Sequence, residues 1–374
     1  MSKPMTVLQL LPELNVGGVE RGTLEIARAL TAAGHRALVV SGGGRLVPEL
    51  EDLGATHIEL PIGRKHARTL GLIGPLAKIL ADHEADIVHA RSRLPAWVGW
   101  LARRRLPAAE QPRWVTTVHG PYTVNRYSRI MVSGQRVIAI SEFIRDYITH
   151  YYRQVDHKRI EVIPRGVDTA RYFADFVPDD NWLDEWRRTQ IPLDNKFVIA
   201  LPARLTRWKG QLEFIELLRR LRADDEAVAG VIIGAAHPRK PRYADELKTA
   251  VARAGIEDDV AFLGHRNDLR EILSVCDCAM SLTTEPEAFG RTTIEALALG
   301  TPVIGYEHGG TGEILRTVLP RGLVPAGDID AAVKKVKELM TSPWPVPREH
   351  PYSNARMQSS TLALYESLME APSD

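Results

Sequence analysis

Residues 7–41, which read VLQLLPELNVGGVERGTLEIARALTAAGHRALVVS, decide the fold. The stretch opens with an apolar run at Val7–Leu11 and closes with a second one at Ala37–Ser41. Between them, apolar side chains at helical spacing, such as Val19, Ile26 and Leu30, mark one face of a helix. A strand, a helix and a second strand in this order indicate a parallel sheet that is covered by helices.

The same alternation continues along the chain in two series. The first series adds four expected strands, at His57–Pro61, Asp86–Ala90, Val115–His119 and Val137–Ser141. The second series has six expected strands, at Phe197–Ala203, Val228–Gly234, Val260–Gly264, Cys278–Thr283, Pro302–Tyr306 and Leu323–Pro325. The pattern predicts an α/β protein with two doubly wound domains, each long enough to bury its own core.

Composition sets the expected domain boundaries. Residues 1–170 form the first domain and residues 196–350 the second, joined by a linker over 171–195 that is rich in Pro, Asp and Trp. A proline-broken segment then precedes a last amphipathic helix within 351–374. Because ligands of open α/β sheets bind beyond the carboxyl ends of the strands, we expect the site in a cleft between the domains.

Charge and cysteine content exclude several classes of function. The 374 residues carry 48 Lys and Arg against 47 Asp and Glu, so no basic field predicts a nucleic-acid partner. No leader pattern and no run near the ~20 apolar residues that cross a bilayer is visible, which predicts a cytoplasmic protein. Cys276 and Cys278 are expected to be buried thiols rather than a disulfide or zinc pair.

The segment Glu287–Glu295, EAFGRTTIE, carries the most chemistry. It follows an expected strand, turns at Gly290 and enters a helix, so it presents free N–H groups that suit a diphosphate. Glu287 in the turn and Glu295 one helical turn later would accept hydrogen bonds from hydroxyl groups. Two cations, Arg204 and Lys209, follow the first strand of the second domain and are placed to grip phosphates.

Two features of the first domain complete the site. Gly17 and Gly18 follow the first strand and allow backbone to approach a ligand closely. His119 ends an expected strand and precedes a turn, so we expect it to face the cleft and take part in the reaction.

No Asp-x-Asp pair lies at a strand end, and Arg204 with Lys209 would neutralise a departing diphosphate. We therefore expect no metal cofactor.

Together and in this order, these motifs resemble the retaining GT-B glycosyltransferases of glycosyltransferase family 4, over nearly the whole chain. The resemblance implies two Rossmann-like domains that face a central cleft, with the last helix crossing back to the first domain. It also implies metal-independent transfer of a sugar, with retention, from a nucleotide-sugar to a glycan or lipid-linked glycan. UDP is expected over GDP. The segments His89–Arg93 and Asn125–Ser128 resemble, more narrowly, enzymes of lipopolysaccharide-core and envelope-glycan assembly.

The resemblance also implies residue roles. Arg204 and Lys209 would hold the donor diphosphate and Glu295 the nucleotide ribose. Glu287 would contact the transferred sugar and His119 the reaction centre. The other expected donor-binding residues are Gly17, Gly18, His265, Arg266, Phe289, Gly290, Arg291 and Thr292. The expected acceptor-binding residues, all in the first domain, are Arg91, Ser92, Tyr122, Arg126 and Arg165.

Three questions stay open at this point. Many relatives carry Asn where this chain has Arg165, so Arg165 could serve a phosphate, the acceptor or the hinge. Basic and aromatic residues at 64–68 and 94–105 predict either a contact with anionic inner-membrane lipids, on the cytoplasmic face, or a core with a solvated face. Alternative functions are a GT-B-fold sugar-nucleotide epimerase and a non-catalytic nucleotide-sugar-binding protein.

Overall fold

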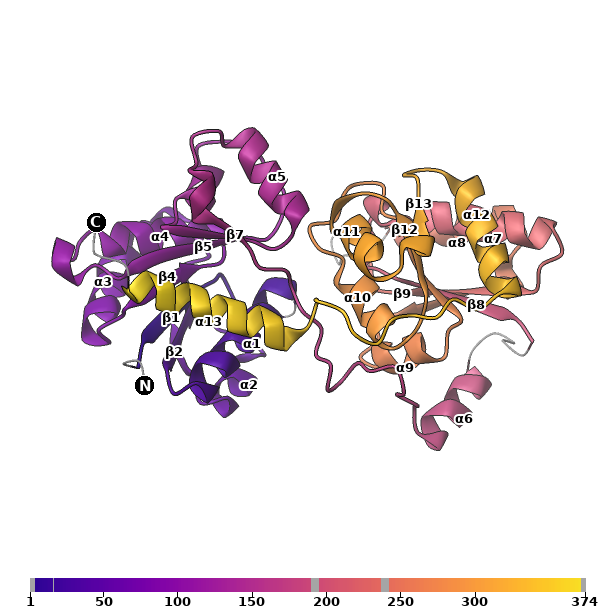
Figure 1. The fold of residues 1–374 in the computed structure, drawn as a ribbon, viewed down its shortest axis with the longest axis horizontal. Coiled ribbons are helices and arrows are strands. Elements are labelled where there is room, and N and C mark those ends of the chain that lie inside the picture. Colours follow the sequence, from indigo (N-terminus) through magenta and orange to yellow (C-terminus); the bar gives the residue numbers. More distant parts are fainter. Residues whose placement is uncertain (1–3, 16, 190–194, 237–241, 371–374) are drawn as a thin grey trace. The chain divides into compact units, whose positions relative to one another are not determined.

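The computed structural model describes residues 4–15, 17–189, 195–236 and 242–370. The chain divides into two compact units, one formed by residues 1–165 with 354–374 and the other by residues 166–353. Each unit is a parallel sheet with helices packed around it, which confirms the predicted fold class (Figure 1).

The described part of the first unit contains a seven-stranded sheet in the order β3-β2-β1-β4-β5-β6-β7. Its strands are β1 (Thr6–Leu10), β2 (Arg36–Ser41), β3 (Thr56–Glu59), β4 (Ile87–Ala90), β5 (Arg113–Val118), β6 (Arg136–Ala139) and β7 (Ile160–Val162). Its helices are α1 (Gly18–Ala32), α2 (Val47–Asp52), α3 (Ile73–Asp82), α4 (Arg93–Arg103), α5 (Glu142–Tyr151) and α13 (Asn354–Glu370). The strand order reverses between β1 and β4, and ligands of such sheets bind at this switch point.

The last helix, α13, belongs to the first unit and runs beside α1 (Figure 1). Its buried face adds Met357, Leu364 and Leu368 to the core cluster that contains Ile26 of α1. The hydroxyl group of Tyr365 also lies 2.6 Å from Nδ1 of the buried His89 on β4. Helix α13 therefore packs on the first unit and contributes to its core.

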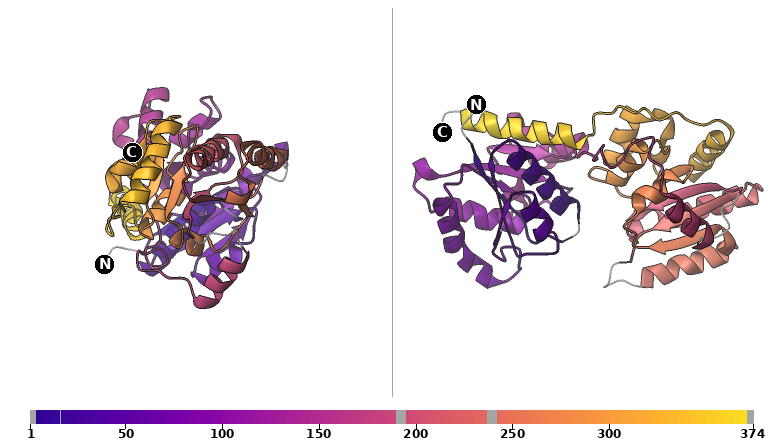
Figure 2. Two further views of the ribbon diagram at one scale, coloured as in Figure 1. Left: turned by 90° about the vertical axis from the view of Figure 1, so that its right-hand side faces the viewer. Right: turned by 90° about the horizontal axis from the view of Figure 1, so that it is seen from below.

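The described part of the second unit contains a six-stranded sheet in the order β10-β9-β8-β11-β12-β13, with helices on both faces (Figure 2). Its strands are β8 (Phe197–Pro202), β9 (Val228–Ile233), β10 (Val260–Gly264), β11 (Cys278–Ser281), β12 (Val303–Tyr306) and β13 (Leu323–Val324). Its helices are α6 (Asp180–Thr189), α7 (Gln211–Ala223), α8 (Arg242–Ala254), α9 (Leu269–Ser274), α10 (Arg291–Ala298), α11 (Gly309–Val318) and α12 (Ile329–Thr341). Here the switch point lies between β8 and β11.

The segment expected as a linker packs on the second unit. Trp182 of α6 donates a hydrogen bond from Nε1 to Asp268 Oδ2 at 2.8 Å and stacks on Trp186. Arg270 lies over the ring of Phe176, 3.9 Å from its centroid. The division between the units thus falls after Arg165 rather than after residue 170. Residues 190–194 of the expected linker and 371–374 of the last segment lie outside the described residues.

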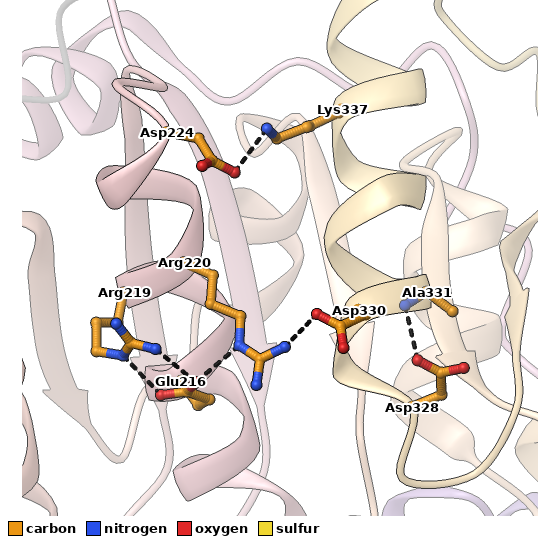
Figure 3. Close-up of polar contacts among 8 residues, drawn as sticks. All are labelled: Glu216, Arg219, Arg220, Asp224, Asp328, Asp330, Ala331 and Lys337. Atoms are coloured by element: carbon orange, nitrogen blue, oxygen red, sulfur yellow. Dashed lines mark hydrogen bonds and ion pairs between the residues drawn. The ribbon is translucent and has the colours of Figure 1, made fainter.

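Surface ion pairs join α7 to α12 in the second unit (Figure 3). Glu216 accepts hydrogen bonds from Arg219 at 2.8 Å and from Arg220 at 2.7 Å. The hydrogen bond from Arg219 lowers the pKa of Glu216 to about 2. Lys337 of α12 donates to Asp224 at 2.8 Å. These side chains face solvent, so screening keeps their contribution to stability small.

Candidate functional site

In the second unit, the functional segments leave the two strands that flank the switch point. β8 leads to Arg204 and the 3-10 turn Arg207–Lys209, and its neighbour β11 leads to the loop that contains Glu287. Gly210, at φ 79°, ends the turn, and a Cβ there would overlap the carbonyl oxygen of Leu282. Only glycine allows this close approach. The contact holds the segment that follows β8 against the segment that follows β11.

This arrangement brings Lys209 and Glu287 together as an ion pair. Their side chains are only 15% and 12% exposed, and Lys209 Nζ also lies 4.2 Å from the centroid of the Trp208 ring. Burial lowers the pKa of Lys209 to about 8, and the positive charge of Arg204 acts in the same direction. The Glu287 carboxylate opposes this effect because it favours the charged amine. A half-buried cation next to an exposed one, Arg204, is suited to an anion with two phosphates.

The start of α11 holds the Glu287 loop in place. Gly310 N donates to the Glu287 carbonyl oxygen at 2.8 Å, and Thr311 Oγ1 donates to the Glu287 carboxylate at 3.4 Å. A Cβ on Gly310 would overlap the backbone of Phe289. Sequence reasoning did not single out this contact, although the run Gly309–Gly312 after β12 is the signal that could have indicated it.

Glu295 lies one turn into α10, where Arg291 Nε is 3.6 Å from its carboxylate. Gly290, at φ 94°, starts the helix, so the N–H groups of Arg291 and Thr292 belong to its first turn. Tyr172, from the segment expected as a linker, is a neighbour that sequence reasoning missed. Burial, and then the charge of Glu295, raises the pKa of this tyrosine to about 12.

His265 and Arg266, which the resemblance places at the donor beside the nucleotide base, follow β10, two strands away from β8 in the sheet. His265 is exposed. Arg266 donates two hydrogen bonds to Asp268, at 2.8 and 2.5 Å, and these bonds lower the pKa of Asp268. The guanidinium of Arg266 is therefore held within its own loop, and a contact with the base stays a prediction.

In the first unit, the residues that the sequence places in the site follow β1, β4 and β5. Gly17 precedes α1 and Gly18 is its first residue, in the segment that follows β1. His119 follows β5, and its Nδ1 lies 2.8 Å from Arg165 Nη2. Burial, and then Arg165 and Arg91, lowers the pKa of His119 well below its ordinary value. The ring is therefore neutral at physiological pH.

The five expected acceptor-binding residues differ in exposure. Arg91 and Arg165 are buried, with 2% and 8% of their surface exposed, and Arg91 Nη1 donates to Gln9 Oε1 at 2.7 Å. Ser92 and Tyr122 are half-buried, and Arg126 is exposed. The burial of the two arginines favours an indirect role over direct contact with an acceptor. That the residues of the two units meet across a cleft stays a prediction.

The described residues contain no group of three or more His, Cys, Asp and Glu that could hold a metal ion. In the same part of the chain, every helix is too short or too polar to cross a bilayer. Cys276 and Cys278 are buried free thiols, as expected, and burial raises the pKa of both.

Two family models match the chain. The model described as Glycosyltransferase Family 4 covers residues 16–171, and the one described as Glycosyl transferases group 1 covers residues 184–358. The first therefore matches the unit that carries His119, and the second matches the unit that carries Lys209 and Glu287.

Curated relatives resemble the chain over most of its length. A D-inositol 3-phosphate glycosyltransferase of Actinosynnema mirum is 27% identical over 72% of this chain and 66% of its own. A 2-deoxystreptamine glucosyltransferase of Streptomyces kanamyceticus is 23% identical over 86% of this chain and 89% of its own. The chain thus spans about two thirds of the first relative and most of the second.

Solved structures share the arrangement of strands and helices. A glycosyltransferase from Rickettsia africae is 27% identical, with a TM-score of 0.87, over 99% of this chain and 100% of its own. The Anabaena protein HepE, solved in complex with UDP and glucose, is 22% identical, with a TM-score of 0.76, over 98% of both chains. The first likeness covers both units, and the second shows the fold alone.

Proposed function

Because this chain belongs to the GT-B glycosyltransferases of family 4, we propose that it transfers a sugar from a nucleotide-sugar to a hydroxyl group of a glycan or glycolipid. The proposed reaction retains the configuration at the anomeric carbon and needs no metal. The proposed donor is a UDP-sugar and the proposed pathway is lipopolysaccharide-core or other envelope-glycan assembly, on the cytoplasmic side of the membrane.

One observation carries this proposal: the half-buried pair Lys209–Glu287 lies beside Arg204 at the β8/β11 switch point. Two cations can bind a diphosphate, and the carboxylate can accept hydrogen bonds from sugar hydroxyl groups. An epimerase would need a set of carboxylate acids and bases around the sugar ring. A protein that only binds nucleotide-sugars would be expected to have a broken phosphate clamp, whereas both cations are present here.

In the proposed step, the bond from the anomeric carbon to the diphosphate oxygen breaks, and the acceptor oxygen bonds to that carbon on the same face. The leaving phosphate oxygen takes the acceptor proton, so no carboxylate has to act as a nucleophile. Arg204 and Lys209 stabilise the charge on the departing diphosphate. Glu287 orients the sugar, and its contacts with Lys209 and Thr311 hold its carboxylate in place before the donor binds.

Names and titles of similar proteins support parts of this assignment. HepE was solved with UDP and glucose. A lipopolysaccharide outer core galactosyltransferase that is 14% identical shares the fold. The curated relatives are named for inositol phosphate and 2-deoxystreptamine acceptors. All three acceptor classes offer ring hydroxyl groups, so an acceptor panel should contain each of them.

Thermal-shift screening against UDP, GDP, ADP and their sugars tests the donor. A ligand at 100 times its Kd stabilises a fold by about 2.7 kcal/mol, and at equal concentration the tighter ligand stabilises it more. Since the proposed donor is a UDP-sugar, we expect UDP-sugars to raise Tm the most. Nucleotide release is then followed with and without each acceptor, and the product linkage is read by NMR. Release that depends on an acceptor, with a retained anomer, supports the proposal. Inversion at C2 of the sugar would indicate an epimerase, and binding without either reaction would indicate a binding protein.

We further propose that the first unit contacts anionic lipid through the basic segment Arg64–Arg68 and the residue Leu70. The basic side chains of this segment are exposed, and Leu70 is 59% exposed. The two tryptophans of the segment 94–105, Trp97 and Trp100, instead contact other residues of the first unit. Trp97 donates to the Tyr127 carbonyl oxygen at 2.9 Å, and Trp100 lies under the guanidinium of Arg104.

Reversing the charge of Lys65 and Arg68 to glutamate should weaken co-sedimentation with phosphatidylglycerol vesicles by about 10-fold or more. Each basic residue near an anionic surface contributes about 1 kcal/mol, and reversal adds repulsion. The double variant Arg153→Glu/Lys158→Glu, at exposed positions after α5, changes the charge by the same amount and is the matched control. Equal sedimentation of both variants would favour a merely solvated face.

A further inference from the structure

A single hydrogen bond determines where the ring proton of His119 lies. Arg165 Nη2 is 2.8 Å from His119 Nδ1, and a guanidinium has donors but no acceptor. Nδ1 must therefore accept, which leaves the proton of the neutral ring on Nε2. The second ring nitrogen is thus a hydrogen-bond donor.

The guanidinium of Arg165 packs between helices α1 and α13. A Cβ on Gly22 of α1 would overlap Arg165 Nη1, so glycine at this position leaves room for the side chain. On the other side, Arg165 Nη1 lies 3.8 Å from the sulfur of Met357 on α13. With Arg165 only 8% exposed, this packing aims its donor at His119.

The charged and titratable groups around His119 keep it neutral. Arg165 and Arg91 are the cations that face it, and both disfavour an imidazolium. His89 on β4 and Tyr122, whose hydroxyl accepts from His119 N at 3.3 Å, are its other titratable neighbours. Glu20 and Glu25 on α1 act on Arg91. A neutral ring in this setting is poorly suited to exchange protons.

The Nε2 atom of His119 is buried and has no hydrogen-bond partner among the described residues. A buried N–H group without an acceptor is costly, and such groups in native proteins usually serve a ligand.

We propose that Arg165 is a positioning residue that locks His119 in the tautomer with the proton on Nε2. His119 then acts in sugar transfer as a hydrogen-bond donor to an oxygen of the bound sugar substrate, and not as an acid or base. The part that concerns the substrate rests on the proposed function, whereas the tautomer does not.

Long-range 1H–15N spectra of protein labelled at histidine test the tautomer without any substrate. His119→Gln assigns the signal. We expect the Nε2–H pattern from pH 5.5 to 8 in the parent protein, and its loss in Arg165→Met. Gly22→Ala, which displaces the guanidinium but keeps both polar residues, should lose it too, and Arg165→Lys should retain it. A parent ring protonated on Nδ1, or an unchanged pattern in both Arg165→Met and Gly22→Ala, would overturn the proposal.

Kinetics test the consequence for transfer. Arg165→Met should lower kcat/KM by about 10-fold, which corresponds to about 1.4 kcal/mol of lost transition-state stabilisation, and Arg165→Lys should restore part of it. A changed tautomer with full activity would overturn the link to transfer. Absence of transfer in the parent protein would instead count against the proposed function, while the spectra would still decide the tautomer.

Discussion

A Lys209→Ala variant is expected to turn over about 100 to 1,000 times more slowly than the parent enzyme, while its fold survives. The substitution removes the half-buried cation that, in our proposal, faces the departing diphosphate. It also leaves the Glu287 carboxylate, only 12% exposed, without its ion-pair partner and next to an anionic substrate. Turnover at saturating donor and the thermal unfolding midpoint, measured on the same preparation, check the two parts of this expectation.

Lys209→Arg is the control, because the pH dependence of binding distinguishes a lysine from an arginine at this position. The pKa of Lys209 is lowered to about 8, so the amine loses its charge as the pH rises through this value. Affinity for a nucleoside diphosphate should therefore fall above pH 8 in the parent protein. It should stay flat in Lys209→Arg, since arginine remains charged. Parent-like turnover of Lys209→Ala would show that the phosphate clamp lies elsewhere.

The sheets could be predicted from sequence because their strands are short apolar runs that are buried on both faces. β8 and β11 agree with the expected segments to within two residues. β7 was missed because it has only three residues, Ile160–Val162, and its central Glu161 is exposed. Such a strand carries neither a continuous apolar run nor an alternation with a buried face.

The candidate site was predictable where it depends on strand ends alone. Parallel strands end at one edge of a sheet, so residues that follow two such strands, Lys209 and Glu287, can meet there, and the structure pairs them. The contacts of Thr311 with Glu287 and of Arg165 with His119 depend on how loops pack after the sheet forms. Local sequence patterns carry no information about such packing.

The second large effect is expected from one methyl group. Gly310→Ala should lower donor affinity and turnover by about 10-fold or more, because its Cβ would overlap backbone atoms of Phe289. Backbone cannot rotate away as a side chain can, so the loop that carries Glu287 must shift. Overpacking of this kind also costs about 1 to 3 kcal/mol of unfolding free energy. Titration with the nucleoside diphosphate and denaturant unfolding measure the two effects.

Gly71→Ala in the first unit serves as the matched control, since a Cβ there meets no atom within 4 Å. It should keep parent affinity and turnover, which separates the overlap at Gly310 from a general effect of replacing glycine. If Gly310→Ala binds donor as the parent does but unfolds more easily, α11 supports the unit without setting the position of Glu287. If stability and affinity fall together and Thr311→Val lowers affinity alone, the start of α11 is part of the donor site. The Thr311→Val result therefore decides whether the hydrogen bond to Glu287 or the backbone contact at Phe289 positions the carboxylate.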